Sequence, residues 1–177
     1  MNKHEMHIDL SKLTRLRKKL GTNMIVKVGV LGADASAAHE EPVTKYDAKT
    51  GKPYRVAGFR SGLTNAALAI IHIFGSITRG IPPRDFLRAP LLDKSKEIVQ
   101  FLGNKEIKKL IEAGEKVQVF KLLGLKAEQI VYRAFVTGGF GKWPALKPQT
   151  IKRKGSSKPL IDTGQLPRSV SSEVVSK

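Results

Sequence analysis

The chain has 177 residues, and its 32 Lys and Arg against 15 Asp and Glu give a formal net charge of +17. This length favours a single domain spanning residues 1–177, and a hydrophobic content of 41% is enough to build a core. The absence of cysteine excludes disulfide scaffolds, thiol nucleophiles and cysteine zinc sites, and no apolar run approaches the roughly 20 residues of a membrane span.

The first 22 residues predict a basic amphipathic helix over residues 8–20. Leucines recur along it at spacings of three and four, with lysines and arginines off that stripe. Such a helix could bind phosphates or a membrane surface, or it could pack on the core with a solvated basic face. The start, Met1–Glu5, lacks the apolar core of a signal peptide, so we expect the protein to stay in the cytoplasm where it is made.

A β-branched run at residues 23–31 predicts the first strand. Residues 32–53 are polar and carry little apolar content, which predicts a long loop or an extended hairpin arm, with 54–59 as the returning strand. An arm of this kind could reach a neighbouring molecule, or it could be an ordinary surface loop.

The middle of the chain predicts helices. The first covers 63–74 and ends at Gly75; the second covers 93–113, with a weak point at Gly103-Asn104. A third runs over 115–137, where we expect Gly124 to break it. Between the first two, the prolines of residues 81–90 predict a rigid extended segment.

Residues 138–177 predict a basic loop followed by a C-terminal strand over 168–175, which could pair with the first strand. The whole pattern predicts an α+β fold: a small antiparallel sheet packed by several helices, with the long loop or hairpin arm as an extension.

None of the patterns that resemble catalytic motifs is complete. Asp162-Thr163-Gly164 matches an aspartic protease loop, but only 13 residues follow it, so we interpret it as a turn or helix cap. Gly138–Lys142 lacks the phosphate-loop spacing, and His4 and His7 are three residues apart where a zincin helix needs four. His72 has apolar neighbours and no adjacent acid, which favours a satisfied, partly buried histidine. The sequence therefore predicts no enzyme, no cofactor and no metal.

Three stretches occur together in an order that resembles a known family. They are Ala69–Gly75, Ile81–Arg88, and a third that runs from Trp143 through Arg153-Lys154-Gly155 to Leu166. Together they resemble the tailed-phage virion morphogenesis, or tail completion, family. The resemblance implies a structural virion protein of the neck that completes the tail and joins it to the head. It also implies a ring of copies, with six favoured and twelve as the alternative, in contact with neighbouring neck, connector and tail-tube proteins.

Two groups of residues are candidate contacts of such a ring. Arg84, Phe86, Leu87 and Arg88 would lie at a subunit boundary, where a rigid segment presents two apolar anchors and two guanidinium donors. The alternative is that this segment buries its apolar residues in its own domain.

The second group consists of basic residues that could face packaged double-stranded DNA or an acidic neighbour, or could simply be solvated: Lys147, Lys152, Arg153, Lys154 and Lys158. The high charge also keeps open a second function, a non-enzymatic duplex nucleic-acid-binding module, although no base-reading motif accompanies it.

Overall fold

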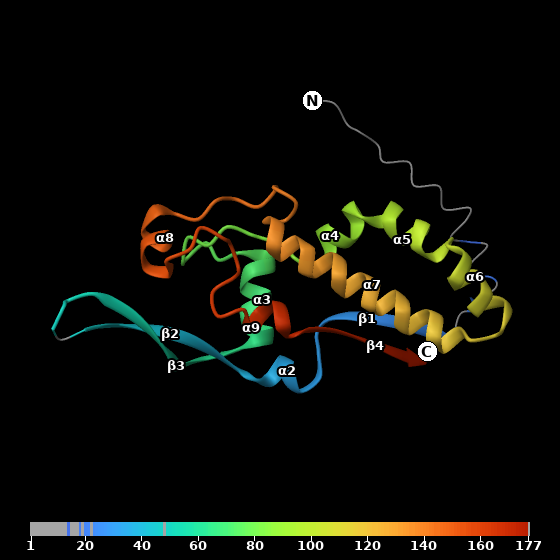
Figure 1. Ribbon diagram of the computed structural model, residues 1–177, viewed down its shortest axis with the longest axis horizontal. Helices are drawn as coiled ribbons and strands as arrows, with labels where there is room; N and C mark the ends of the chain where they lie inside the picture. The colour runs from blue at the N-terminus through green and yellow to red at the C-terminus, as the bar shows by residue number, and fades with distance from the viewer. Residues whose placement is uncertain (1–13, 15–17, 19, 22, 48, 177) are drawn as a thin grey trace, which may run out of the picture.

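The computed structural model describes residues 14, 18, 20–21, 23–47 and 49–176 (Figure 1). Its elements in chain order are β1 (Met24–Val30), α2 (Gly32–Ser36), β2 (Ala38–Tyr46), β3 (Pro53–Thr64), α3 (Asn65–Phe74), α4 (Arg88–Asp93), α5 (Ser95–Leu102), α6 (Lys105–Glu112), α7 (Lys116–Thr137), α8 (Pro148–Lys154), α9 (Gln165–Arg168) and β4 (Val170–Ser176). Most of the predicted helix 8–20 lies outside the described residues; Thr14, Lys18 and Leu20 within it are helical.

The first and last strands form one antiparallel sheet, in register from Met24 opposite Ser176 to Val30 opposite Val170. This confirms the predicted pairing of the chain's two ends. Helix α7 lies along one face of the sheet (Figure 1). The predicted strand start at 168 is wrong, because α9 covers Arg168 and β4 begins at Val170.

Strands β2 and β3 form a second antiparallel pair, which confirms the hairpin alternative for the arm. The arm extends away from the helices (Figure 1), and its returning strand continues to Thr64, beyond the predicted 54–59. Asp47 closes the turn, since its Oδ1 accepts from the backbone N–H of Thr50 at 2.7 Å and from that of Lys49 at 3.0 Å. At the base of the arm, the Asn65 side-chain amide donates to the Asp34 carbonyl at 3.0 Å and connects α3 to α2.

The helix boundaries test two predictions about glycines. The weak point at Gly103-Asn104 is confirmed: α5 ends there, and the Asn104 side chain caps α6 by accepting from the Ile107 N–H at 2.8 Å. The predicted break at Gly124 is wrong, because α7 passes through it without interruption. Gly124 is buried against the sheet, where an added Cβ would lie 2.3 Å from Ser172 Oγ and 3.4 Å from Val26 Cγ1. This glycine therefore permits close packing of helix on sheet.

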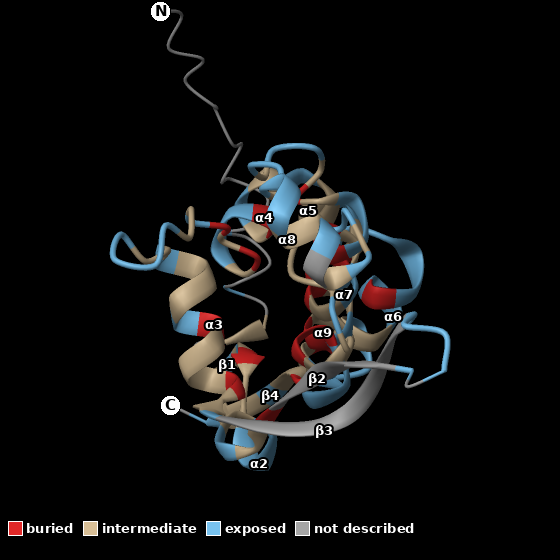
Figure 2. Ribbon diagram, turned by 90° about the vertical axis from the view of Figure 1, so that its left-hand side faces the viewer, coloured by how far each residue is buried: buried red, intermediate tan, exposed pale blue. Residues whose placement is uncertain are grey.

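The buried residues gather where α7, α9 and the β1–β4 sheet meet (Figure 2). The main cluster consists of Ala69, Phe86, Val131, Phe135 and Leu166, and a second one consists of Leu102, Ile107 and Val119. The Phe86 and Phe135 rings are in contact, with centroids 4.8 Å apart and planes tilted by 41°. Two small antiparallel sheets packed by helices confirm the α+β class.

An ion-pair network fastens α5 to α7. Glu97 accepts two hydrogen bonds of 2.9 Å from the Arg133 guanidinium and one of 2.6 Å from Lys126 Nζ. These donors lower the pKa of Glu97 to about 2, and the hydrogen bonds from Arg133 contribute most.

No helix in the described part of the chain is both long and apolar enough to cross a bilayer.

Candidate functional site

The three stretches that carry the family resemblance meet around one groove of about 870 Å³. We call it the motif groove; helices α3, α8 and α9 surround it (Figure 1). Its charged and imidazole side chains are His39, His72, Arg79, Arg84, Lys147, Lys154 and Asp162, and its large aliphatic ones are Leu63, Leu68, Ile71, Ile81, Leu146, Leu160 and Leu166.

A tight turn after α3 brings the proline-rich stretch back beside that helix. Gly75 has a φ of 77°, and an added Cβ there would lie 2.7 Å from the Ile81 carbonyl oxygen and 2.9 Å from the Pro83 nitrogen. Only glycine fits both the left-handed backbone and this close approach. Ser76 and Ile81 then exchange backbone hydrogen bonds of 2.8 and 2.9 Å, which fix the turn and aim the chain along the groove.

Arg84 is buried in the wall of the groove and connects the proline-rich stretch to the segment at Pro144 and Ala145. Its side chain is only 4% exposed, and it donates from Nε and Nη2 to the Pro144 carbonyl at 3.1 and 2.9 Å and from Nη2 to the Ala145 carbonyl at 3.2 Å. Its backbone N–H donates to the His72 carbonyl at 2.7 Å. Burial lowers the pKa of Arg84, which remains charged.

The expected subunit contacts need correction at two positions. Phe86 is completely buried in the core and Arg84 is buried under the 144–145 segment, so neither presents its side chain to a neighbour in this fold. Leu87 is half-buried and packs on the same core. Arg88 is exposed, with Nε 3.6 Å from the Asp85 carboxylate. Arg84 and Phe86 are therefore buried within their own domain, which is the alternative that the sequence left open.

The basic candidates divide between the groove and the open surface. Lys147 is exposed and lines the groove, and so does the half-buried Lys154, whose Nζ donates to the Lys158 carbonyl. Lys152 and Lys158 are exposed and lie outside the described lining. The side chain of Arg153 lies outside the described residues.

Arg79 and Gln165 are two lining residues that the predicted contacts do not include. Arg79 belongs to the short turn after α3. Gln165, which lies in the third stretch of the resemblance, begins α9, and its Nε2 donates to the Ala38 carbonyl at 2.9 Å. No local pattern marks Arg79, because it reaches the groove only through contacts distant in sequence. Asp162-Thr163-Gly164 forms the predicted turn before α9, with the Gln165 N–H donating to Thr163 Oγ1 at 3.3 Å.

His72 differs from expectation. It is partly buried as predicted, but its buried Nδ1 finds no hydrogen-bond partner among the described residues. Burial, reinforced by the nearby charge of Arg84, lowers the pKa of His72 to about 4. The imidazole is therefore neutral at pH 7. The described residues contain no group of three or more His, Cys, Asp or Glu side chains that could hold a metal ion.

The depressed pKa of His72 predicts a pH-dependent stability. Because the unfolded chain binds the proton near pH 6.5 and the folded chain only near 4, the stabilisation by neutral His72 is complete above 6.5 and is lost as pH falls toward 4. We expect about 2 kcal/mol of loss, less than the full shift implies because the ring is not fully buried. Urea unfolding at pH 7.5 and 4.5 measures it, and His72→Gln should remove this part of the pH dependence. An unchanged dependence in the variant would contradict the assignment to His72.

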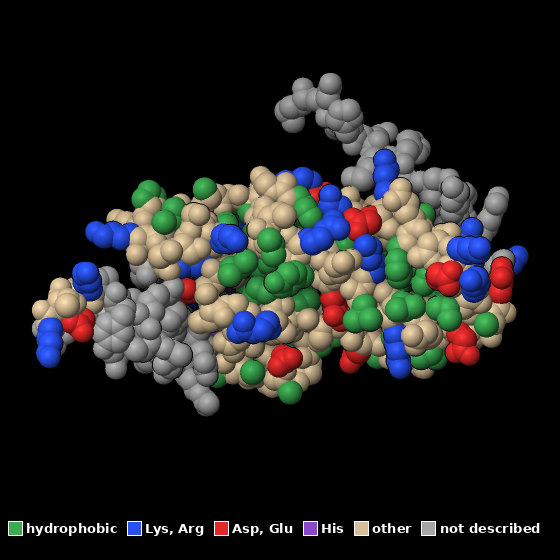
Figure 3. Space-filling view, in the orientation of Figure 1, with side chains coloured by type: hydrophobic (Ala, Val, Ile, Leu, Met, Phe, Trp, Pro, Cys, Tyr) green, Lys and Arg blue, Asp and Glu red, His purple; other side chains and the backbone are tan. Residues whose placement is uncertain are grey.

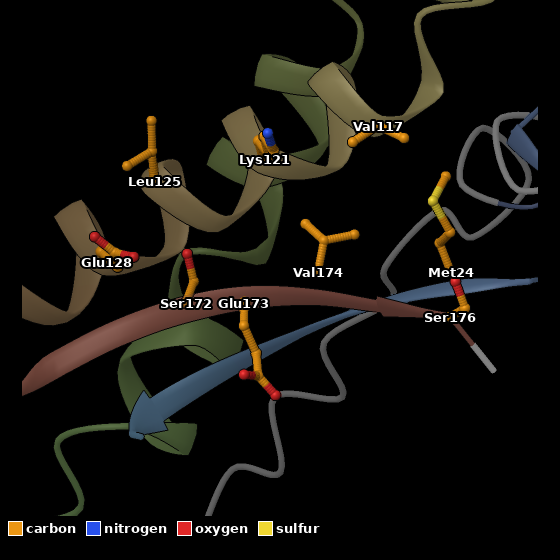
Figure 4. Close-up of a pocket in the computed structure, with 9 residues that line it drawn as sticks. All are labelled: Met24, Val117, Lys121, Leu125, Glu128, Ser172, Glu173, Val174 and Ser176. Carbon is orange, nitrogen blue, oxygen red and sulfur yellow. The ribbon is translucent and has the colours of Figure 1, made fainter. Parts of the chain in front are cut away.

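A second surface runs along α7. A groove of about 610 Å³ lies between this helix and β4. In Figure 4, Leu125 and Val117 of the helix lie above Ser172 and Val174 of the strand. The outward side of α7 carries four exposed apolar residues that we call the α7 stripe, Val117, Leu125, Tyr132 and Val136, with Lys121 and Glu128 among them. Hydrophobic side chains lie among basic and acidic ones on this side of the molecule (Figure 3). Within the described residues, no other strand pairs with the outer edge of β4.

Comparison with known proteins identifies no relative. No family model, no curated protein and no solved structure matches this chain.

Proposed function

We propose that this protein is a structural virion protein of the phage neck that completes the tail and joins it to the head as one subunit of a ring. The observation that carries the proposal is the α7 stripe beside the open edge of β4. The protein acts by assembly and not by catalysis. Six copies are favoured and twelve are the alternative, as the family resemblance implies.

The α7 stripe has the character of an interface. Leu125 and Tyr132 are 58% and 57% exposed, and the stripe residues fall within about a third of the helix circumference at 3.6 residues per turn. Single exposed apolar residues are ordinary, but a row of them beside unpaired strand groups favours contact with another chain. A neighbouring chain that covers the α7 stripe and the open edge of β4 would remove apolar surface from water and form hydrogen bonds with the backbone of β4.

The positions of the surfaces favour a ring over a twofold dimer. A closed ring needs two different patches on each copy. The hairpin arm and the β4 edge lie toward opposite ends of the molecule, so they can serve as these two patches (Figure 1).

The resemblance to the tail completion family adds a second line of support. Its three stretches are separated in sequence yet share one groove, as expected if they serve one purpose. The ring would contact neighbouring neck, connector and tail-tube proteins in the virion. Assembly would take place in the host cytoplasm, with the exposed lysines of the C-terminal block available to packaged DNA.

Replacing Leu125 and Tyr132 together with Asp is expected to prevent ring formation, because two carboxylates in the stripe would have to be buried against the neighbour. Native mass spectrometry and negative-stain images of the purified protein measure the oligomer. Ile77→Asp, at a fully exposed apolar residue outside the stripe, is the matched control and should leave the ring intact. Absence of the protein from purified particles would refute the neck function.

The alternative function, a duplex nucleic-acid-binding module, draws on the net charge of +17 and the exposed Lys147, Lys152 and Lys158. Duplex affinity measured across salt concentrations distinguishes it. Tight binding with a steep salt dependence and no ring would favour the module, because phosphate contacts release counterions.

A further inference from the structure

The motif groove holds positive charge that the described part of the chain does not neutralise. Arg79, Arg84 and Lys147 form no ion pair with a carboxylate there, and Asp162 is the one acidic residue in the described lining. Lys126 and Arg133, by contrast, are both paired with Glu97. The groove therefore attracts an anionic group.

One buried polar atom of the groove also lacks a partner. His72 Nδ1 finds no hydrogen-bond partner in the described structure. The Arg84 guanidinium, by contrast, is satisfied inside the wall by the carbonyls of Pro144 and Ala145. An unpartnered buried polar atom carries a free-energy cost, which a hydrogen bond from a bound ligand would relieve.

The apolar residues of the lining indicate which class of anionic ligand fits the motif groove. Leu68, Ile71 and Leu160 give the groove an apolar part, which a small inorganic anion would leave uncovered. A DNA duplex could touch Lys147 and Arg79 but would leave the apolar residues Leu68 and Ile71 uncovered. An extended peptide can bring both carboxylates and apolar side chains, and a volume of about 870 Å³ accommodates several of its residues.

We propose that the motif groove binds an extended acidic segment, with carboxylates interleaved with apolar side chains, of a partner protein. This deepens the proposed function, on which it rests: the α7 stripe joins copies within the ring, and the motif groove receives a protein of the adjoining structure. Carboxylates of the segment pair with Arg79 and Lys147, and its apolar side chains cover Leu68 and Ile71.

The test uses the full chain and a fluorescein-labelled peptide of alternating Glu and Leu residues, with a Gln and Leu peptide as the uncharged probe. Fluorescence anisotropy should show binding of the acidic peptide only. The variant Arg79→Glu with Lys147→Glu should weaken it about tenfold or more, since both residues line the groove. The control Lys152→Glu with Lys158→Glu makes the same change of net charge outside the described lining and should leave affinity within about twofold.

Three outcomes would overturn the inference. Equal weakening by both double variants would show attraction by net charge alone. Competition by inorganic phosphate as effective as that of unlabelled acidic peptide would show a simple anion site. Duplex DNA that binds with the same dependence on Arg79 and Lys147 would show a nucleic-acid site.

Two further measurements separate this inference from the proposed function. The NMR titration of His72 should move to higher pH in the presence of the acidic peptide, because a nearby carboxylate favours the imidazolium; an unchanged titration would place the peptide elsewhere and overturn the inference. Ring formation is scored separately. A ring that forms without any peptide binding refutes the groove assignment alone, whereas peptide binding without a ring refutes only the ring.

Discussion

Replacing Phe86 with Ala is expected to lower the free energy of unfolding by about 3–5 kcal/mol. Phe86 is 0% exposed, and its ring packs at a tilt against that of Phe135, with centroids 4.8 Å apart, in the main core cluster. Truncation removes the transfer energy of the ring and leaves a cavity that α7 and α9 cannot close without moving. Urea denaturation of the variant and the parent at pH 7.5 gives the difference directly.

Phe74 supplies the matched control, because it is also a phenylalanine but is 76% exposed at the end of α3. Phe74→Ala should change the free energy of unfolding by only about 0.5 kcal/mol. Similar losses for the two variants would contradict the burial of Phe86. If Phe86→Ala prevented ring formation without any loss of stability, Phe86 would be a contact between subunits.

Replacing Gly124 with Val is expected to lower the free energy of unfolding by about 3 kcal/mol. Intrinsic helix propensity alone predicts a small gain, since valine is a better helix former than glycine. The Cβ would, however, lie 2.3 Å from Ser172 Oγ and 2.9 Å from Ser172 Cβ, so α7 must move off the sheet. Thermal or urea unfolding decides between the gain and the loss.

Gln129→Val tests the same helix at an exposed position and should cost only a few tenths of a kcal/mol. Adding Ser172→Gly to Gly124→Val should recover part of the loss, because it removes the side chain that the new Cβ meets. If Gly124→Val stabilised the protein, or if the double variant recovered nothing, the close approach of Gly124 to Ser172 would be contradicted.

The charge of +17 predicted a polyanionic partner but could not say where it binds. In the folded chain some of the cations form internal ion pairs: Lys126 and Arg133 pair with Glu97, and Lys142 Nζ lies 2.6 Å from the Asp93 carboxylate. Folding leaves other cations without carboxylate partners in the described structure, and three of these line one groove. Net charge is a sum over the chain, whereas recognition depends on which charges remain unpaired side by side.

The candidate contacts illustrate the same limit. The prolines of residues 81–90 indicated an extended segment with Phe86 and Arg84 on it, but an extended segment has two sides, and local sequence does not say which is buried. Phe135 of α7 and the carbonyls of Pro144 and Ala145 decide this, and they lie far away in sequence. Arg79 escaped prediction for the same reason.

The sequence by itself determined the α+β class and the helix boundary at Gly103-Asn104. It also indicated a polar loop or hairpin arm over residues 32–53 and a possible pairing of the two end strands. These follow from hydrophobic periodicity, β-branched runs and capping residues, which act within a few residues of chain. Only the tertiary structure decided that Gly124 is a packing contact, that Arg84 and Phe86 lie inside, and that three separated stretches share one groove. Each of these depends on which side of an element meets another, and that is settled by burial and hydrogen bonding across the whole chain.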